Sequence, residues 1–195
     1  MIKQFEFYFD FGSPYSFLAH NEIRRIEKEN SIKIRYMPIL LGWLFEMAGT
    51  KANADIPIKG KYMIKDCKLW AEKYNIEFKF NNYFPIMTLN LMRGVLVAEK
   101  KGFSENFINE VFDSIRKHGL DLNDNQIFEK VLKTLNINPK TFLIESADHK
   151  IKNELKKRTT EAFAKGIFGA PSFIINNKIF WGQDRLEFVL NEARK

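Results

Sequence analysis

The first forty residues alternate between segments with different hydrophobic spacing. Phe5, Phe7 and Phe9 recur at every second position with Glu6 and Tyr8 between them, which predicts a strand with one buried face. Residues 15–29 then carry apolar side chains at helical spacing, and residues 32–41 form a second apolar run. A strand, a helix and a strand in this order predict a βαβ unit, with parallel strands and a right-handed crossover.

Helical spacing dominates the rest of the chain up to its last thirty residues. Apolar positions three and four apart predict helices over residues 61–74, 88–102, 104–118, 125–135 and 151–165. The chain then closes with two short apolar strands around a turn at residues 176–178, and with a helix over residues 185–194.

This order of elements predicts an α/β protein with a thioredoxin-like fold, in which an all-helical domain is inserted between the βαβ and ββα halves. We expect residues 1–45 and 158–195 to form the discontinuous thioredoxin-like domain and residues 46–157 to form the inserted helical domain.

The composition indicates a folded chain with a substantial core. The chain has 195 residues, of which 45% are hydrophobic and 19 are phenylalanine, and this is enough to bury a core without disulfides. The single cysteine, Cys67, excludes an internal disulfide and is expected to be a structural thiol. No apolar run reaches the roughly 18 residues of a membrane span, and no signal peptide is apparent after Met1. We therefore expect a cytoplasmic protein with no membrane partner.

The charge balance favours small anionic ligands over nucleic acid. Lys and Arg number 31 against 24 Asp and Glu, a net charge of +7, but the basic residues are spread along the chain without a block. His20, His118 and His149 are isolated from one another, so we expect surface histidines and no metal site.

Ser13 and Pro14 lie between the first predicted strand and the first helix. Serine is a favoured N-cap and proline is favoured at the first helical position, so one interpretation is a structural cap alone. The other is that the Ser13 hydroxyl and the free N–H groups of the helix stabilise a bound anion such as a thiolate.

Two further segments leave similar alternatives open. Pro171 precedes a predicted strand and is either an ordinary trans turn proline or a cis proline that leaves the N–H and C=O of Ala170 free for an extended ligand. Gln183 and Asp184 precede the last helix, where they are either a simple cap or acceptors for an ammonium group.

Four motifs in this order carry a family resemblance that spans Phe5 to Arg194. They are FDFGSPYS at residues 9–16, KGKY at 59–62, GIFGAPSF at 166–173 and FWGQDRL at 180–186. The sequence resembles bacterial 2-hydroxychromene-2-carboxylate isomerases and the closely similar kappa-class glutathione transferases. The resemblance implies a DsbA-like thioredoxin fold and a homodimer that uses reduced glutathione and acts on a small electrophilic or aromatic carboxylate substrate.

The resemblance also implies a role for individual residues. Ser13 would hydrogen-bond the glutathione sulfur, and Ala170, before a cis Pro171, would pair with the cysteinyl backbone. Lys59 would meet the glycyl carboxylate. The γ-glutamyl end would be held by Gln183 and Asp184. Thr50 stands where the kappa class usually has an asparagine that reaches glutathione, and Met87 where many isomerase-like sequences have another.

Three functions follow as alternatives. An isomerase would add the thiolate reversibly to a conjugated substrate and release glutathione unchanged, whereas a kappa-type transferase would keep the new sulfur–carbon bond. A non-catalytic thioredoxin-like binding module would not bind glutathione. Disulfide exchange is not expected, because it needs a cysteine where the chain has Ser13, usually with a second where it has Ser16.

Overall fold

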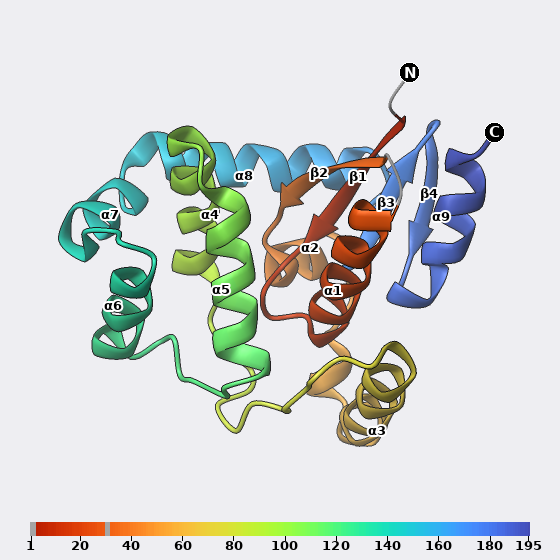
Figure 1. Ribbon diagram of the computed structural model, residues 1–195, viewed down its shortest axis with the longest axis horizontal. Helices are drawn as coiled ribbons and strands as arrows, with labels where there is room; N and C mark the ends of the chain where they lie inside the picture. Colours follow the sequence, from red (N-terminus) through yellow and green to blue (C-terminus); the bar gives the residue numbers. More distant parts are fainter. Residues whose placement is uncertain (1–2, 30–31) are drawn as a thin grey trace.

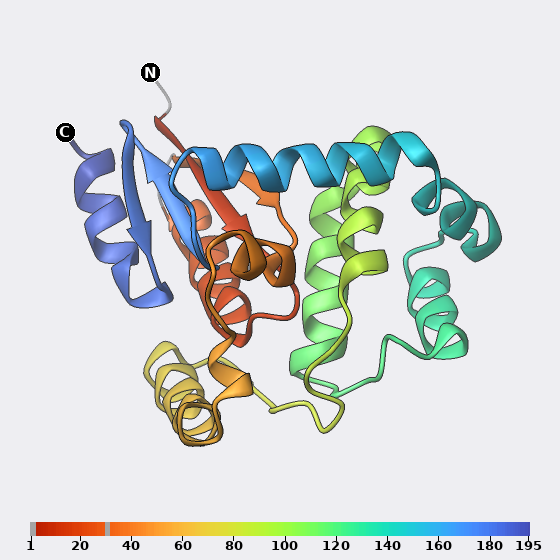
Figure 2. The ribbon, with the colours of Figure 1, turned by 180° about the vertical axis from the view of Figure 1, so that it is seen from behind.

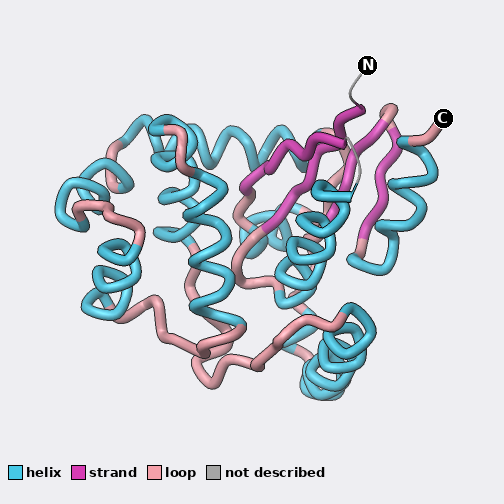
Figure 3. The backbone as a smooth tube through the Cα atoms, in the orientation of Figure 1, coloured by secondary structure: helices cyan, strands magenta, loops and turns pink. Residues whose placement is uncertain are grey.

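A four-stranded mixed sheet forms one part of the molecule in the computed structural model, which describes residues 3–29 and 32–195 (Figures 1 and 3). Its strands, in the spatial order β2-β1-β3-β4, are β2 (Ile32–Pro38), β1 (Lys3–Phe9), β3 (Ser172–Ile175) and β4 (Lys178–Trp181). β1 pairs in parallel with β2 and antiparallel with β3, and β3 pairs antiparallel with β4. The predicted βαβ unit and closing hairpin are therefore confirmed.

Helices make up most of the remaining chain. They are α1 (Pro14–Glu29), α2 (Leu41–Met47), α3 (Pro57–Tyr74), α4 (Leu89–Lys101), α5 (Ser104–Arg116), α6 (Asn125–Thr134), α7 (Pro139–Ser146), α8 (His149–Ala164) and α9 (Leu186–Ala193). Two short 3₁₀ turns, Asn53–Asp55 and Gln183–Arg185, complete the elements. Two of these helices, α2 and α7, were not predicted from the sequence, and they have only 7 and 8 residues.

The second apolar run was predicted as one strand over residues 32–41, but β2 ends at Pro38. The Ile39 N–H still donates to the Phe9 carbonyl of β1 at 3.1 Å. The two N–H groups that follow leave the sheet: Leu40 donates to Thr159 Oγ1 at 3.0 Å and Leu41 donates to Asp10 Oδ2 at 2.9 Å. These bonds turn the chain away from the sheet and into α2.

The alternation in β1 sorts its side chains onto two covered faces. Phe5, Phe7 and Phe9 are fully buried in the main core, to which α1, α9 and the helices of the middle region contribute. Tyr8 points to the other face, where a smaller cluster joins it to residues of α2 and α8. Both faces of the central strand are therefore shielded from water.

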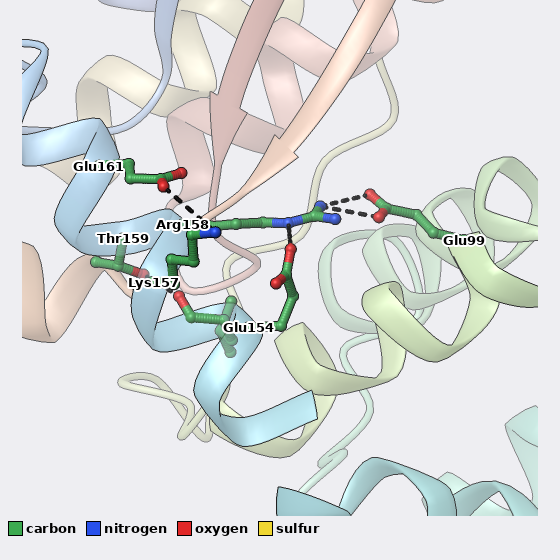
Figure 4. A network of polar contacts seen from close by, with 7 residues as sticks. Glu99, Glu154, Lys157, Arg158, Thr159 and Glu161 are labelled. Atoms are coloured by element: carbon green, nitrogen blue, oxygen red, sulfur yellow. Dashed lines mark hydrogen bonds and ion pairs between the residues drawn. The ribbon is translucent and has the colours of Figure 1, made fainter. Parts of the chain in front are cut away.

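The long helix α8 connects the helical region to the sheet, as the view from behind shows (Figure 2). Arg158 donates to both carboxylate oxygens of Glu99 on α4, at 2.8 and 3.1 Å, and to Glu154 one turn earlier at 2.8 Å (Figure 4). Because α8 runs without a break across residues 157 and 158, the predicted domain boundary falls inside a continuous helix.

One predicted surface residue lies in the core. His20 is only 3% exposed, because its position on α1 places it on the same side as Phe17 and Ile23. Its ring is held between the Tyr36 hydroxyl, 3.0 Å from Nδ1, and Asn109 Oδ1, 2.8 Å from Nε2. The expectation of a surface histidine at this position was wrong. Cys67 is buried and free, as predicted.

Across the described ranges, 3–29 and 32–195, the helices lack the length and apolar character needed to cross a bilayer.

Candidate functional site

Ser13 caps α1 at the point where β1 turns into the helix. The Ser13 hydroxyl accepts the Ser16 N–H at 3.1 Å, which is the bond expected of an N-cap. Pro14 occupies the first helical position and has no N–H to satisfy. The Tyr15 N–H, next in the helix, has no hydrogen-bond acceptor within the described part of the chain. The tip of α1 therefore has an open donor where the helix dipole is positive.

The Ser13 hydroxyl also connects the two halves of the fold. The Ala170–Pro171 peptide bond is cis, as the family resemblance implied. Ser13 Oγ donates to the Ala170 carbonyl oxygen at 2.9 Å across 157 residues of sequence. The alternative with a cis proline also had the Ala170 C=O free for a ligand, but the Ser13 hydroxyl occupies this carbonyl. The Ala170 N–H has no partner among the described residues and stays available.

A cavity of about 650 Å³ opens in front of these groups. Six of the seven predicted site residues line it: Ser13, Thr50, Ala170, Pro171, Gln183 and Asp184. They come from four separate parts of the sequence. Ser13 belongs to the βαβ half, Thr50 to the segment after α2, and the other four to the ββα half and the loop before it. The structure thus brings these six residues together around one cavity. Their contacts with a ligand remain predictions.

Lys59 lies at the edge of this group. It is exposed on α3 and lines an adjoining pocket of about 480 Å³, which shares Tyr15, Asn53, Tyr62 and Met63 with the main cavity. A lysine side chain is long and flexible, so an extended ligand that leaves the main cavity along α3 would meet its ammonium group. Met87 is not among the residues that line the cavity and is 77% exposed.

Backbone geometry at Gly182 places Gln183 and Asp184 in the wall of the cavity. Gly182 has φ +108°, and a Cβ there would lie 2.5 Å from Asp184 Oδ1, so this position requires glycine. Gln183 is buried, whereas Asp184 is partly exposed and pairs with the guanidinium of Arg185. The carboxylate of Asp184 can therefore attract a positively charged ligand group, and the size of this attraction depends on the position of the Arg185 guanidinium.

Aromatic side chains form much of the remaining wall of the cavity. Phe168 and Trp181 pack edge to face with ring centroids 4.9 Å apart, and both line the cavity. Trp70 and Phe84 contribute from α3 and the segment after it. Tyr15 donates to Asp66 Oδ2 at 2.8 Å on the same wall. These rings would suit a flat, conjugated molecule.

A buried carboxyl group lies directly behind the Ser13 turn. Asp10 accepts the Gly12 N–H at 2.8 Å and the Leu41 N–H at 2.9 Å, and so connects the turn before Ser13 to the start of α2. Burial raises the pKa of the Asp10 carboxyl above its usual range, against the lowering effect of these backbone bonds. The sequence analysis did not single out Asp10, although it belongs to the first quoted motif.

Comparison with known families agrees with this architecture. The family model of the DSBA-like thioredoxin domain matches residues 4–193. The chain belongs to the DsbA-like thioredoxin family. The chain has serine at positions 13 and 16, the two positions where disulfide exchange would need cysteine.

Individual relatives give a finer comparison than the family model does. The chain is 29% identical to a 2-hydroxychromene-2-carboxylate isomerase from Sphingobium xenophagum over 97% of both chains. It is 25% identical to glutathione S-transferase kappa 1 from Caenorhabditis elegans, over 96% of this chain and 89% of that protein. A solved 2-hydroxychromene-2-carboxylate isomerase superposes with a TM-score of 0.88 at 24% identity, over 98% of this chain and 94% of the other. The resemblance drawn from the motifs is confirmed, and it supports the prediction of an enzyme.

Proposed function

We propose that this protein is a glutathione-dependent isomerase of the 2-hydroxychromene-2-carboxylate type. The observation that carries the proposal is the position of the Ser13 hydroxyl, which caps α1 and faces the cis Ala170–Pro171 bond inside a cavity of about 650 Å³. A hydroxyl donor at a helix N-terminus stabilises an anion but cannot form a disulfide. It therefore suits a thiolate that the ligand brings with it.

The thiolate would replace the Ala170 carbonyl as the partner of Ser13. Ser13 Oγ now donates to Ala170 O, and rotation about one side-chain bond would redirect this proton to the sulfur without loss of the Ser16 N–H bond. A free thiol has a pKa near 8.5, and a helix N-terminus with a charge-assisted hydrogen bond lowers that value by about one unit or more. No histidine base is then needed.

The rest of glutathione would extend along the cavity in both directions. The open Ala170 N–H is placed to pair with the cysteinyl backbone, as in strand addition. Gln183 and Asp184 would receive the γ-glutamyl end. Thr50 and Lys59, on the side toward α3, would receive the glycyl carboxylate.

The reaction would use the sulfur twice. The thiolate adds to a conjugated carbon of the substrate, and as the sulfur–carbon bond forms, the electron pair of the attacked double bond moves into the rest of the conjugated system. The former double bond is now single and rotates. The electron pair then returns, the double bond re-forms and the thiolate is expelled, so glutathione emerges unchanged. Phe168 and Trp181 would hold the aromatic part of the substrate beside the sulfur.

A second candidate is a kappa-type glutathione transferase, which is supported by the similarity to the Caenorhabditis elegans protein over almost the whole chain. The two reactions share the first step and differ in whether the sulfur–carbon bond is broken again.

The proposal also includes the oligomeric state and the compartment that the family resemblance implies, namely a homodimer in the cytoplasm. Size-exclusion chromatography with light scattering would test the dimer, and a monomeric mass would exclude it.

Two measurements test the proposed function. Calorimetric titration with reduced glutathione is expected to show binding, whereas no heat at millimolar ligand would favour the non-catalytic binding module. Turnover of a hydroxychromene carboxylate is then followed together with the concentration of free thiol. Product formation at constant thiol supports the isomerase, and stoichiometric loss of thiol supports the transferase.

A further inference from the structure

A fully buried arginine lies behind the turn that presents Ser13. Arg116 is the last residue of α5 and is 0% exposed. Its Nη2 atom donates to the Gly12 carbonyl at 2.8 Å and to the Phe11 carbonyl at 3.2 Å, the two residues immediately before Ser13. The side chain of Arg116 thus joins the helical region to the turn that precedes Ser13.

The guanidinium is held in place by its surroundings but is only partly satisfied. Its centre lies 5.5 Å from the ring of Phe84, which lines the cavity. Its Nε and Nη1 atoms are buried and have no hydrogen-bond partner in the described chain. Such a charge costs free energy to bury, so a fold that keeps one without a salt bridge has a reason other than stability.

Few charged groups act on this guanidinium. Asp10 lies behind the same turn and favours the charged form of Arg116, as does the thiol of Cys67 if it ionises. Burial raises the pKa of Cys67 to about 12, so that side chain is neutral near pH 7. Burial lowers the pKa of Arg116 to about 10, which leaves it positively charged at neutral pH. A positive charge therefore persists under the cavity, where water screens it little.

We propose that Arg116 is a positioning residue whose buried charge both holds the Phe11–Gly12 turn and stabilises an anion bound at Ser13, in part by offsetting the carboxyl of Asp10. The identity of the anion as a glutathione thiolate rests on the proposed function. The electrostatic effect does not, because any anion at Ser13 would feel the same charge.

The test places a thiol in the site without glutathione. In the Ser13→Cys variant, the pKa of the introduced thiol is measured from the pH dependence of its alkylation by iodoacetamide. Cys67 contributes little to this reaction because it is buried. Arg116→Gln is then added, since glutamine can still donate to the two carbonyls but carries no charge. We expect the thiol pKa to rise by about one unit, with a roughly tenfold lower thiolate fraction at low pH.

Arg116→Lys is the matched control in the same background. It keeps the charge while changing the shape and the number of donors, so it should leave the thiol pKa within a few tenths of a unit of the value with arginine. A purely structural role predicts that both substitutions act alike. If glutamine and lysine give the same thiol pKa, or if neither shifts it, the proposal is overturned.

A second measurement needs no change at Arg116 and covers the case in which Arg116→Gln does not fold. The ¹⁵N resonance of the Arg116 guanidinium is followed with pH in Ser13→Cys and in the unsubstituted protein. It should shift at the pKa of the introduced thiol in the variant alone. Absence of any such shift would refute the electrostatic coupling, whereas a failure to bind glutathione would refute only the proposed function.

Discussion

Removal of the buried histidine should change how stability depends on pH. The His20 ring is buried, with Asn109 Oδ1 2.8 Å from Nε2 and the Tyr36 hydroxyl 3.0 Å from Nδ1, and a neutral ring with its proton on Nε2 satisfies both contacts. Protonation would place a charge in the core. Burial accordingly lowers the pKa of His20 from 6.5 to about 3.

The sign and size of the effect follow from proton linkage. Below pH 6.5 the unfolded chain takes up a proton at His20 and the folded chain does not, so stability falls as the pH drops toward 3. Each pH unit well inside this window costs about 1.4 kcal/mol. Between pH 8 and pH 5 the contribution of His20 sums to about 2 kcal/mol.

Urea unfolding at pH 8, 6.5 and 5 would measure this contribution as a difference between variants. His20→Gln should be less stable than the original chain at pH 8, because packing against Phe112 is lost, but this gap should shrink by about 2 kcal/mol at pH 5. His118→Gln, which removes an exposed histidine in place of the buried one, is the matched control. A gap for His20→Gln that stays constant from pH 8 to pH 5 would show that His20 does not contribute to the pH dependence of stability.

Three glycine substitutions test separate features: the packing of α4, the backbone of α2 and the turn that holds Asp184. Gly94→Ala should lower the free energy of unfolding by about 1–3 kcal/mol, because its Cβ would lie 2.7 Å from the ring of Phe107; an unchanged urea midpoint would contradict this. Gly42→Ala, with open space around it in α2, should instead raise stability by about 0.4–1 kcal/mol in the same assay. Gly182→Ala should weaken glutathione binding in calorimetry by displacing Asp184, and unchanged affinity would show that this turn does not set the site.

The fold could be predicted because its signals are local. The alternation in β1, the cap at Ser13 and the hairpin turn each depend on neighbouring residues. The two asparagines of that turn, Asn176 and Asn177, both have positive φ, as the turn requires. Short helices such as α7 were not predicted, because 8 residues contain too few apolar positions to show a helical period.

The site could be predicted only in part, because its polar contacts join distant segments. The bond from Ser13 to the Ala170 carbonyl spans 157 residues, and no local pattern contains it. Arg116 and His20 carried a usable signal, since each occupies an apolar face of its helix: Arg116 lies four residues after the buried Phe112. A charged or polar residue on such a face is a candidate for a buried role.

The most direct test of the account is the ionisation of glutathione on the protein. The absorbance of bound thiolate near 240 nm is followed with pH for the unsubstituted chain, Ser13→Ala and the control Ser16→Ala, whose buried hydroxyl has no partner in the described structure. Ser13→Ala costs about 1 kcal/mol of capping but should leave the fold intact. The account predicts a bound-thiol pKa at least about one unit below 8.5 in the unsubstituted chain and in Ser16→Ala, and a clear rise in Ser13→Ala. A bound thiol that titrates like free glutathione, or equally in all three proteins, would contradict it.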